Sequence, residues 1–387
     1  MAPSGAQRRI AVFALTEDGA GIAGRVATVL GGSLWLPRSL AVAGGAGTHR
    51  FGRLGPALRS AFRRSDALVC VMATGVVVRS LAPVLQGKRQ DPAVLCLDER
   101  GLFVIPLLSG HVGGANELAR SLADMLSAQA VLTTSSDVQG LAGPDVLADL
   151  LDAEVGDPAA LLPVSAALVN HRPVDLWFDP GEMGGAEAFL RELLGYQPRV
   201  FRAGELPVPA SVWAAEGGAT RAVFVTARLT PAEAGEELAA PLHLVPRWTV
   251  AGVGCKRGTA RAAITGAVRT ALARADLDPR ALRSMASVEA KHDESGLAGA
   301  AAELGLPLAF APDEEVERVM ALHGLAENAF VRENVGVGAA AEPAALWASG
   351  EGATLVLPKQ AADGVTVALA RADGGRMLRT GETRWGR

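Results

Sequence analysis

A glycine-rich turn carries the residues of this sequence that are best suited to chemistry. It reads S-G-H-V-G-G-A-N-E over residues 109–117, between an apolar run and an amphipathic run. Glycines let a ligand approach the backbone, and the helix that follows would offer N–H groups and the positive end of its dipole to a carboxylate or phosphate. The alternative is a tight turn with Asn116 or Gly114 at the helix N-cap. We predict that an anionic substrate is bound here by Ser109, Gly110, Gly113, Gly114 and Asn116.

Two side chains of the same turn are candidates for proton transfer. A histidine titrates near neutral pH, so His111 could move a proton at a reacting carbon or oxygen. Glu117 is the second candidate. Each has a simpler interpretation, because His111 could hydrogen-bond only its own loop and Glu117 could complement the helix dipole. We predict His111 and Glu117 as the catalytic residues.

A second group combines a Thr-Gly pair with three cations. Thr74 and Gly75 end a strand-like run and could offer a hydroxyl and backbone N–H groups. Arg79, Lys88 and Arg89 would add positive charge, since arginine binds carboxylates through two hydrogen bonds and lysine acts as a point charge. We predict that these five residues bind the substrate. The alternative is that the cations are solvated surface charges.

A third group surrounds the turn G-V-G-C-K-R-G-T over residues 252–259. Gly254, Lys256 and Arg257 lie where an anion would dock, and Lys291 follows the next strand-like run. The glycine spacing differs from that of a dinucleotide-binding turn. Cys255 could be a nucleophile, but a plain turn residue is the simpler interpretation. We predict that Gly254, Lys256, Arg257 and Lys291 bind anionic groups of the substrate.

These turns need elements that position them, and strand-like and helix-like runs alternate along the chain. The run 116–126, for example, has the apolar period of a packed helix. The alternation predicts an α/β fold with a mostly parallel sheet. Composition shifts predict an N-terminal α/β domain (1–139), a less regular middle domain (140–246) and a C-terminal α/β domain (247–387).

The composition argues against several classes of protein. The 387 residues carry a formal net charge of −4, whereas a general nucleic-acid binder is normally basic. No stretch approaches the roughly 20 apolar residues of a membrane helix, and we find no signal peptide. Cys70, Cys96 and Cys255 are far apart and lack the spacing of a zinc site. We expect a cytoplasmic protein with no membrane or nucleic-acid partner and no metal site.

Taken together, these motifs resemble one family. The segments A-T-G-V-V-V-R-S-L-A-P-V-L and L-F-V-I-P-L-L-S-G-H-V-G-G-A-N-E-L-A-R are similar to the N-terminal core of cobalt-precorrin-5A hydrolase, the CbiG family. The segments G-V-G-C-K-R-G-T, S-V-E-A-K-H-D-E-S-G-L and L-V-L-P-K-Q are similar to its C-terminal domain. The similarity is dense between Ala73 and Leu126 and loose between Leu141 and Arg247.

The resemblance implies both a reaction and a substrate. An enzyme of this family opens the δ-lactone of cobalt-precorrin-5A with water, releases acetaldehyde and gives cobalt-precorrin-5B. The cobalt is carried by this anionic tetrapyrrole, so the resemblance implies no cofactor. His111 would transfer the proton, and the N–H groups of Gly113 and Gly114 would stabilise the oxyanion or a carboxylate. Carboxylates of the substrate would be held by Arg79, Lys88, Lys256 and Arg257.

Two other functions stay open at this point. The two glycine turns could belong to a nucleotide-dependent oxidoreductase. A non-catalytic carrier of tetrapyrroles would bind the substrate without turnover. The oligomeric state is equally open, and a homodimer or contacts with other enzymes of the pathway are both compatible with the sequence.

Overall fold

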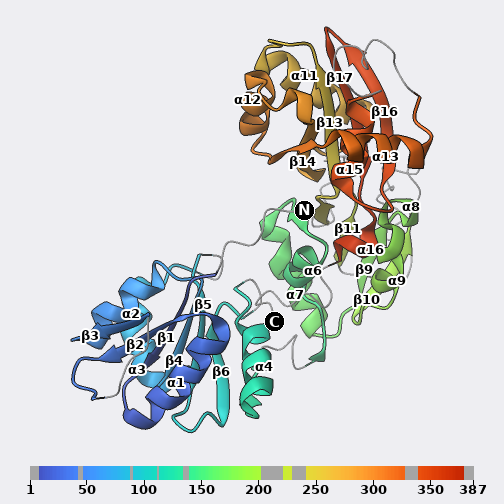
Figure 1. The fold of residues 1–387 in the computed structure, drawn as a ribbon. Helices are drawn as coiled ribbons and strands as arrows, with labels where there is room; N and C mark the ends of the chain where they lie inside the picture. The colour runs from blue at the N-terminus through green and yellow to red at the C-terminus, as the bar shows by residue number, and fades with distance from the viewer. Residues whose placement is uncertain are drawn as a thin grey trace. The chain divides into compact units, whose positions relative to one another are not determined.

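The computed structural model shows three β-sheets in two compact units (Figure 1). It describes residues 8–41, 47–87, 90–110, 113–133, 139–201, 221–228, 241–326 and 339–378. The first unit ends at Gly140, and the second begins at Leu141. Three residues of the predicted site, Lys88, Arg89 and His111, lie outside the described residues.

The first unit is built on a seven-stranded sheet in the order β3-β2-β1-β4-β5-β6-β7. Its strands are β1 (Ile10–Ala14), β2 (Ser33–Pro37), β3 (Thr48–Phe51), β4 (Ala67–Val71), β5 (Ala93–Leu97), β6 (Phe103–Leu108) and β7 (Gln129–Ala130). Strands β1 to β5 are parallel. Strand β6 is antiparallel to β5, because the turn 98–102 between them is too short for a parallel crossover.

Four helices cover the two faces of this sheet: α1 (Glu17–Leu30), α2 (Leu54–Phe62), α3 (Thr74–Leu81) and α4 (Ala115–Leu126). Helices α1 and α4 pack on the face that carries Val12 and Val69. Helices α2 and α3 pack on the opposite face, which carries Phe13 and Cys70. Successive strand residues point to opposite faces, so each central strand feeds both cores. This explains why the central strands are apolar throughout.

The second unit begins with a five-stranded sheet in the order β10-β9-β11-β12-β8. Its strands are β8 (Ala153–Val155), β9 (Val174–Phe178), β10 (Tyr196–Val200), β11 (Arg221–Val225) and β12 (Leu242–Pro246). All but β8 are parallel. One face packs against α6 (Pro144–Leu150), α7 (Leu161–Val169), α8 (Pro180–Met183) and α9 (Glu187–Arg191). Trp177, Phe201 and Phe224 form a small aromatic cluster on the other.

The last sheet has the order β15-β14-β13-β17-β16. Its strands are β13 (Thr249–Cys255), β14 (Leu282–Val288), β15 (Leu308–Ala311), β16 (Thr354–Ala362) and β17 (Val365–Arg371). Helices α11 (Arg261–Arg274) and α12 (Ser295–Leu304) cover one face, and α13 (Asp313–His323) and α15 (Ala341–Ser349) the other. Strands β13, β14 and β15 are parallel, and β17 is antiparallel to β13. The predicted α/β fold with mostly parallel strands is confirmed.

Both sheets of the second unit share buried residues. Trp248, just before β13, belongs to the core of the middle sheet, and its indole N–H donates to the carbonyl of Leu151 at 2.7 Å. Helix α16 (Gly374–Met377) follows β17 and lies so close to Met183 that a side chain on Gly374 would overlap the carbonyl of Met183. The separation into domains 140–246 and 247–387 stays a prediction, since one unit contains both sheets.

Candidate functional site

The order of the first sheet marks one edge as the natural place for a ligand. The chain leaves β1 toward β2 and β3 on one side, and it returns to β4 on the other side of β1. Strands β1 and β4 are therefore neighbours at a topological switch point. Open α/β sheets bind ligands outside the carboxyl ends of the strands at such a point. Helices α1 and α3 begin at this edge.

Thr16 organises the start of α1. Its hydroxyl accepts the N–H of Gly19 at 3.2 Å and donates to the Glu99 carboxylate at 2.8 Å. Gly19 is close to β4, because an added Cβ would lie 3.4 Å from Val71 Cγ1 and 3.5 Å from the Val71 carbonyl oxygen. Helix α1 therefore starts beside the carboxyl end of β4, and Glu99 reaches the same edge from the end of β5.

Thr74 and Gly75 lie at this edge too, but not as the sequence predicted. They do not end the strand, which stops at Val71; they are the first two residues of α3. The Cys96 thiol donates to the Met72 carbonyl at 2.9 Å. Burial raises the pKa of Cys96, against the hydrogen bonds with Thr74 and Met72, so the thiol stays protonated and ties the start of α3 to β5.

Arg79 brings its charge to the start of α3. An added Cβ on Gly75 would lie 3.2 Å from Arg79 Nη1, so the absence of a side chain at Gly75 leaves room for the guanidinium. The edge thus combines the N-termini of α1 and α3, one guanidinium and the Thr16–Glu99 pair. Helix N-termini and a guanidinium suit a carboxylate, while Glu99 is a carboxylate that could accept a proton. We call this group (Thr16, Thr74, Gly75, Arg79 and Glu99) the switch-point cluster.

Ser109, at the start of the predicted turn, lies at the opposite edge of the same sheet. Because β6 is antiparallel, Leu108 pairs with Val94, at the start of β5 rather than its end. The Ser109 hydroxyl accordingly donates to the carbonyl of Asp91 at 2.7 Å, in the loop before β5. A five-residue strand such as β5 spans about 16 Å. The structure therefore separates Ser109 and its neighbours from Thr74 and Gly75, which the sequence alone could not show.

Close packing accounts for two glycines of this turn. A Cβ on Gly113 would overlap the side chain of Ser109 and lie 2.7 Å from its carbonyl oxygen. A Cβ on Gly110 would lie 2.8 Å from the amide oxygen of Asn116. Gly114 is the N-cap, with a left-handed φ of 77°, and Ser109 has a φ of 57°. The N-cap alternative for Gly114 is thus confirmed.

The prediction that the start of α4 offers free N–H groups needs a correction. The N–H of Ala115 donates to the carbonyl of Ser109 at 3.1 Å, and that of Asn116 to the carbonyl of Gly110 at 2.9 Å. The turn folds back on itself and uses these two donors. Asn116 is buried, and Glu117 is half-buried in the first helical turn. The described residues place Glu117 beside the turn, and His111 lies outside them.

The third predicted group is assembled by two neighbouring strands. Strands β13 and β14 are parallel, so the turn after Cys255 and the segment after Val288 meet at one edge. The N–H of Gly258 donates to the Glu294 carboxylate at 3.0 Å, and Lys291 Nζ lies 3.6 Å from its other oxygen. A protein carboxylate thus occupies the N–H of Gly258, in the turn that carries the predicted residues Lys256 and Arg257.

The other members of this group divide between surface and core. Lys256 and Arg257 are exposed, and Arg257 lies 3.5 Å from the Asp293 carboxylate. Lys291 is buried, with 8% of its surface exposed. Gly254 is also buried, and a Cβ there would lie 2.5 Å from the hydroxyl of Thr366. Gly254 is therefore explained by strand packing rather than by a ligand.

Cys255 lies beside Lys291 and Glu294 at the end of β13. Burial raises the pKa of its thiol, the ammonium of Lys291 acts in the opposite direction, and Glu294 raises it further. A protonated thiol is a weak nucleophile. The plain interpretation of Cys255 fits this environment better than a nucleophilic role.

The part of the chain that the structure describes offers neither a metal site nor a membrane-spanning helix. Within it, no three His, Cys, Asp or Glu side chains are grouped so that they could hold a metal ion. No helix in the described ranges is long and apolar enough to span a membrane.

Sequence reasoning missed two residues of the switch-point cluster, Thr16 and Glu99. One signal was available, because Thr16 follows an apolar run and precedes Glu17 and Asp18, which is typical of a helix N-cap. No local pattern pointed to Glu99, which reaches the cluster only because β5 lies beside β4.

Two family models match the chain. The model described as Cobalamin synthesis G N-terminal matches residues 56–137, and the model described as Cobalamin synthesis G C-terminus matches residues 249–370. The first range covers β4 to β7 with the turn 109–117, and the second covers most of the last sheet.

Two curated proteins and one solved structure are similar to the chain. A Salmonella typhimurium protein named cobalt-precorrin-5A hydrolase is 36% identical over 367 residues, which is 94% of this chain and 97% of the relative. A Priestia megaterium protein of the same name is 31% identical, over 81% of this chain and 80% of the relative. The crystal structure of CobE, a protein from the cobalamin biosynthetic pathway, is similar to 35% of this chain. The match covers 96% of the CobE chain, with 28% sequence identity and a TM-score of 0.31.

Proposed function

This chain belongs to the cobalt-precorrin-5A hydrolase family, and we propose that it opens the δ-lactone of cobalt-precorrin-5A, releasing acetaldehyde to give cobalt-precorrin-5B. The observation that carries the proposal is the identity of 36% with the Salmonella protein over almost the full length of both chains. A match of that extent includes the middle region, which lies between the ranges of the two family models.

The proposed substrate explains why anion-binding features recur in the structure. The tetrapyrrole carries acetate and propionate groups, so several sites must each hold a carboxylate. We assign one carboxylate to the switch-point cluster. There Arg79 lies beside Gly75 in the first turn of α3, and α1 begins at the same edge of the sheet. Further predicted contacts come from the turn at Ser109, Gly110, Gly113, Gly114 and Asn116, from Lys88 and Arg89, and from Gly254, Lys256, Arg257 and Lys291.

The four residues of the third group differ in their access to a substrate. Lys256 and Arg257 are exposed and could contact a substrate directly. Gly254 and Lys291 are buried, and Lys291 already has Glu294 as its partner. We propose that Lys291 supports the turn at Gly258 rather than binding substrate itself.

The proposed chemistry has a hydrolytic step and a cleavage step. Water adds across the acyl C–O bond of the lactone, which forms a carboxylate and frees the alcohol. Loss of the alcohol proton lets the carbon–carbon bond break, so that acetaldehyde leaves and the abandoned carbon takes a proton. The first step needs a base and donors for the oxyanion, and the second needs proton transfer. We propose His111 for proton transfer, with Glu117 as the second catalytic residue.

The proposal assigns no cofactor to the protein, because the cobalt enters and leaves with the substrate. We place the enzyme in the cytoplasm. Its three cysteines support this, since Cys70, Cys96 and Cys255 are all free thiols, as is usual in a reducing compartment. Contacts with a second copy or with neighbouring enzymes of the pathway stay part of the proposal.

The alternative functions are not favoured. A nucleotide-dependent oxidoreductase would need the turn at Gly258 to hold phosphate, and the Glu294 carboxylate accepts that N–H instead. A carrier would bind cobalt-precorrin-5A and release it unchanged. The curated relatives that span the chain are named as hydrolases.

The test is an anaerobic incubation of the pure protein with cobalt-precorrin-5A, with any volatile aldehyde trapped as its hydrazone. Acetaldehyde formed in proportion to the substrate consumed is the expected result. Binding without acetaldehyde would identify a carrier. The absence of both binding and product would refute the proposal.

The proton-transfer role of His111 has its own test. We expect His111→Ala to fold and to lose at least about 100-fold in turnover, since general acid–base groups contribute about 10²–10⁴-fold. The control is His323→Ala, which changes an exposed histidine at the end of α13. Full turnover by a folded His111→Ala protein would remove the assignment.

A further inference from the structure

The middle sheet has a switch point of its own, which no motif in the sequence marks. From β9 the chain passes to β10 on one side and then to β11 and β12 on the other. Strands β9 and β11 are neighbours and parallel, so their carboxyl ends form the edge at which open α/β sheets bind ligands. The residues that follow the two strands are charged: Asp179 and Glu182 after β9, and Arg228 after β11.

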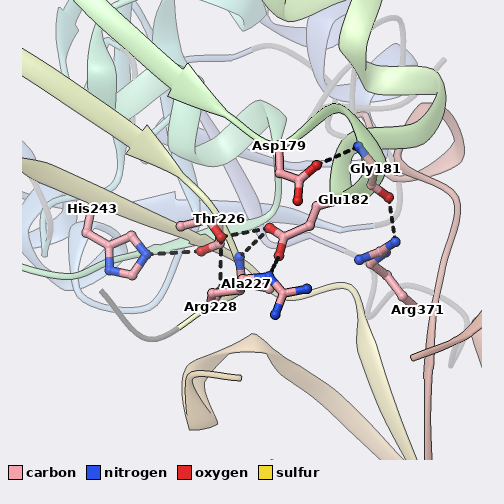
Figure 2. A network of polar contacts seen from close by, with 8 residues as sticks. All are labelled: Asp179, Gly181, Glu182, Thr226, Ala227, Arg228, His243 and Arg371. Atoms are coloured by element: carbon pink, nitrogen blue, oxygen red, sulfur yellow. Dashed lines mark hydrogen bonds and ion pairs between the residues drawn. The ribbon is translucent and has the colours of Figure 1, made fainter. Parts of the chain in front are cut away.

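Glu182 is the centre of a polar network at this edge (Figure 2). Only 3% of its surface is exposed. One carboxylate oxygen accepts the Thr226 hydroxyl at 2.7 Å and the N–H of Ala227 at 3.2 Å. The other lies 2.9 Å from Arg228 Nε. Burial raises the pKa of Glu182, against the hydrogen bond from Thr226 and the charge of Arg228.

A second guanidinium reaches the network from the last sheet. Arg371 ends β17, and its Nη2 donates to the carbonyl of Gly181 at 2.6 Å (Figure 2). Burial lowers the pKa of Arg371, Glu182 and Asp179 act against this, and the charge of Arg228 lowers it further. The positive charges of Arg228 and Arg371 therefore repel one another at the carboxyl ends of β9 and β11. An anion between them would relieve that repulsion.

Both guanidinium groups keep donors that no described residue accepts. A guanidinium has five N–H donors. Arg228 pairs through Nε with Glu182, and the described residues supply no acceptor for its Nη1 and Nη2. Arg371 uses Nη2 on Gly181, and within the described ranges its Nε and Nη1 have no acceptor. The side chain of Arg228 is 22% exposed, so these donors can still be reached by a ligand.

We propose that Arg228 and Arg371 bind a carboxylate of an acidic ligand at the carboxyl ends of β9 and β11. The ion pair with Glu182 engages Nε of Arg228, which leaves Nη1 and Nη2 available as a pair of donors. This is the geometry in which arginine binds a carboxylate with two parallel hydrogen bonds. Arg371 supplies the second cation from a different sheet. The middle region thereby contributes a binding site and does more than connect its neighbours.

The ligand class is a polycarboxylate. On the proposed function, its source is an acetate or propionate side chain of the tetrapyrrole, and this identification rests on that function. A small free polycarboxylate such as citrate offers the same chemistry. The site itself depends only on the two arginines and on Glu182.

The test measures binding of uroporphyrin III, a metal-free tetrapyrrole with acetate and propionate side chains, to the full chain. Titration gives its dissociation constant, and hydrogen–deuterium exchange of 176–184 and 222–228 shows whether it contacts this edge. We expect Arg228→Gln and Arg371→Gln to weaken binding by at least about tenfold each, because a charge-assisted hydrogen bond contributes about 1.5–3 kcal/mol. The matched control is Arg318→Gln, an exposed arginine paired with Glu315.

Two further variants guard against a folding defect. Arg228→Lys and Arg371→Lys keep the charge but lose the paired donors, so we expect a loss of a few-fold. Citrate then distinguishes the sources: displacement of uroporphyrin III by millimolar citrate indicates a site for small polycarboxylates, and its failure indicates a site for the macrocycle's side chains. Unchanged binding and exchange in all four variants, or an equal loss in Arg318→Gln, would overturn the proposal.

These outcomes are separate from those of the proposed function. Acetaldehyde release together with unaltered uroporphyrin III binding in the arginine variants would refute the carboxylate site alone. An arginine-dependent site in a protein that forms no acetaldehyde would refute the hydrolase alone.

Discussion

At the scale of single residues, a glycine in the segment 109–117 can be required either by close packing or by a bound ligand. Gly113 has no room for a side chain, because Ser109 lies against it, and the first N–H groups of α4 donate to carbonyls of the turn. These contacts hold the start of α4 against Ser109 and Gly110. The first turn of α4 carries Glu117, and a fixed position is useful for a residue that must transfer a proton.

The packing explanation predicts a loss of stability on Gly113→Ala. An added methyl group overlaps Ser109, and overpacking costs about 1–3 kcal/mol. The control is Gly21→Ala on the exposed side of α1, where no atom lies within 4 Å of the added Cβ. That change should stabilise by about 0.5–1 kcal/mol, since alanine favours helix. Urea unfolding measures both free energies of unfolding. A Gly113→Ala protein whose free energy of unfolding is unchanged or higher would show that the turn is not tightly packed.

At the scale of elements, the turn between β5 and β6 decides at which edge of the sheet Ser109 lies. Asp98 accepts the N–H groups of Arg100, Leu102 and Phe103 through its carboxylate, each at 2.7–2.8 Å. The turn reverses the chain, so that β6 returns antiparallel to β5. As a result the strand-to-helix turn after β6 faces the opposite edge from the switch-point cluster.

This arrangement predicts a pH-dependent contribution from Asp98. Burial alone would raise its pKa, but the N–H donors of Phe103, Arg100 and Leu102 hold the pKa below the ordinary 3.8. The stabilisation is therefore complete above the unfolded pKa and disappears as pH falls through the folded pKa. At neutral pH, Asp98→Asn should lower the free energy of unfolding by about 1 kcal/mol.

The measurement compares urea midpoints of Asp98→Asn and the unchanged protein from neutral pH downward. The two should converge as the pH falls below about 3.8. Asp124→Asn, on the exposed side of α4, should show no such convergence. A constant difference at every pH would mean that the carboxylate charge has no part in holding the turn.

At the scale of the whole molecule, the chain divides between Gly140 and Leu141. The first unit has its own sheet with a core on each face. The second unit holds two sheets that share Trp248 and the contacts of Arg371 and Gly374. Since each unit buries its own apolar surface, each has the means to fold alone.

The division predicts that residues 1–140 fold as a separate protein. Their circular dichroism should show a cooperative thermal transition, and calorimetry of the full chain should show that transition beside a second one. A single transition for the full chain, with an unfolded fragment, would mean that the two units depend on each other for stability.

Much of the fold could be read from the sequence, because strands and helices leave local patterns. The apolar runs at 67–72, 93–97 and 249–253 become β4, β5 and β13. The strands β8, β10 and β12 were missed. Strand β8 has only three residues, and β10 and β12 each contain a proline, Pro198 and Pro246. Proline is unusual inside a sheet, so it masks the pattern.

The functional residues divide along the same line. The sequence by itself determined the family, the glycine turns, and candidates such as His111, Glu117, Thr74 and Arg79, because these lie within contiguous motifs. The tertiary structure alone decided which candidates meet. It separated the turn at Ser109 from Thr74, buried Lys291 beside Glu294, and brought Arg228 to Arg371. Strand order is set by long-range pairing and packing, which no local pattern records.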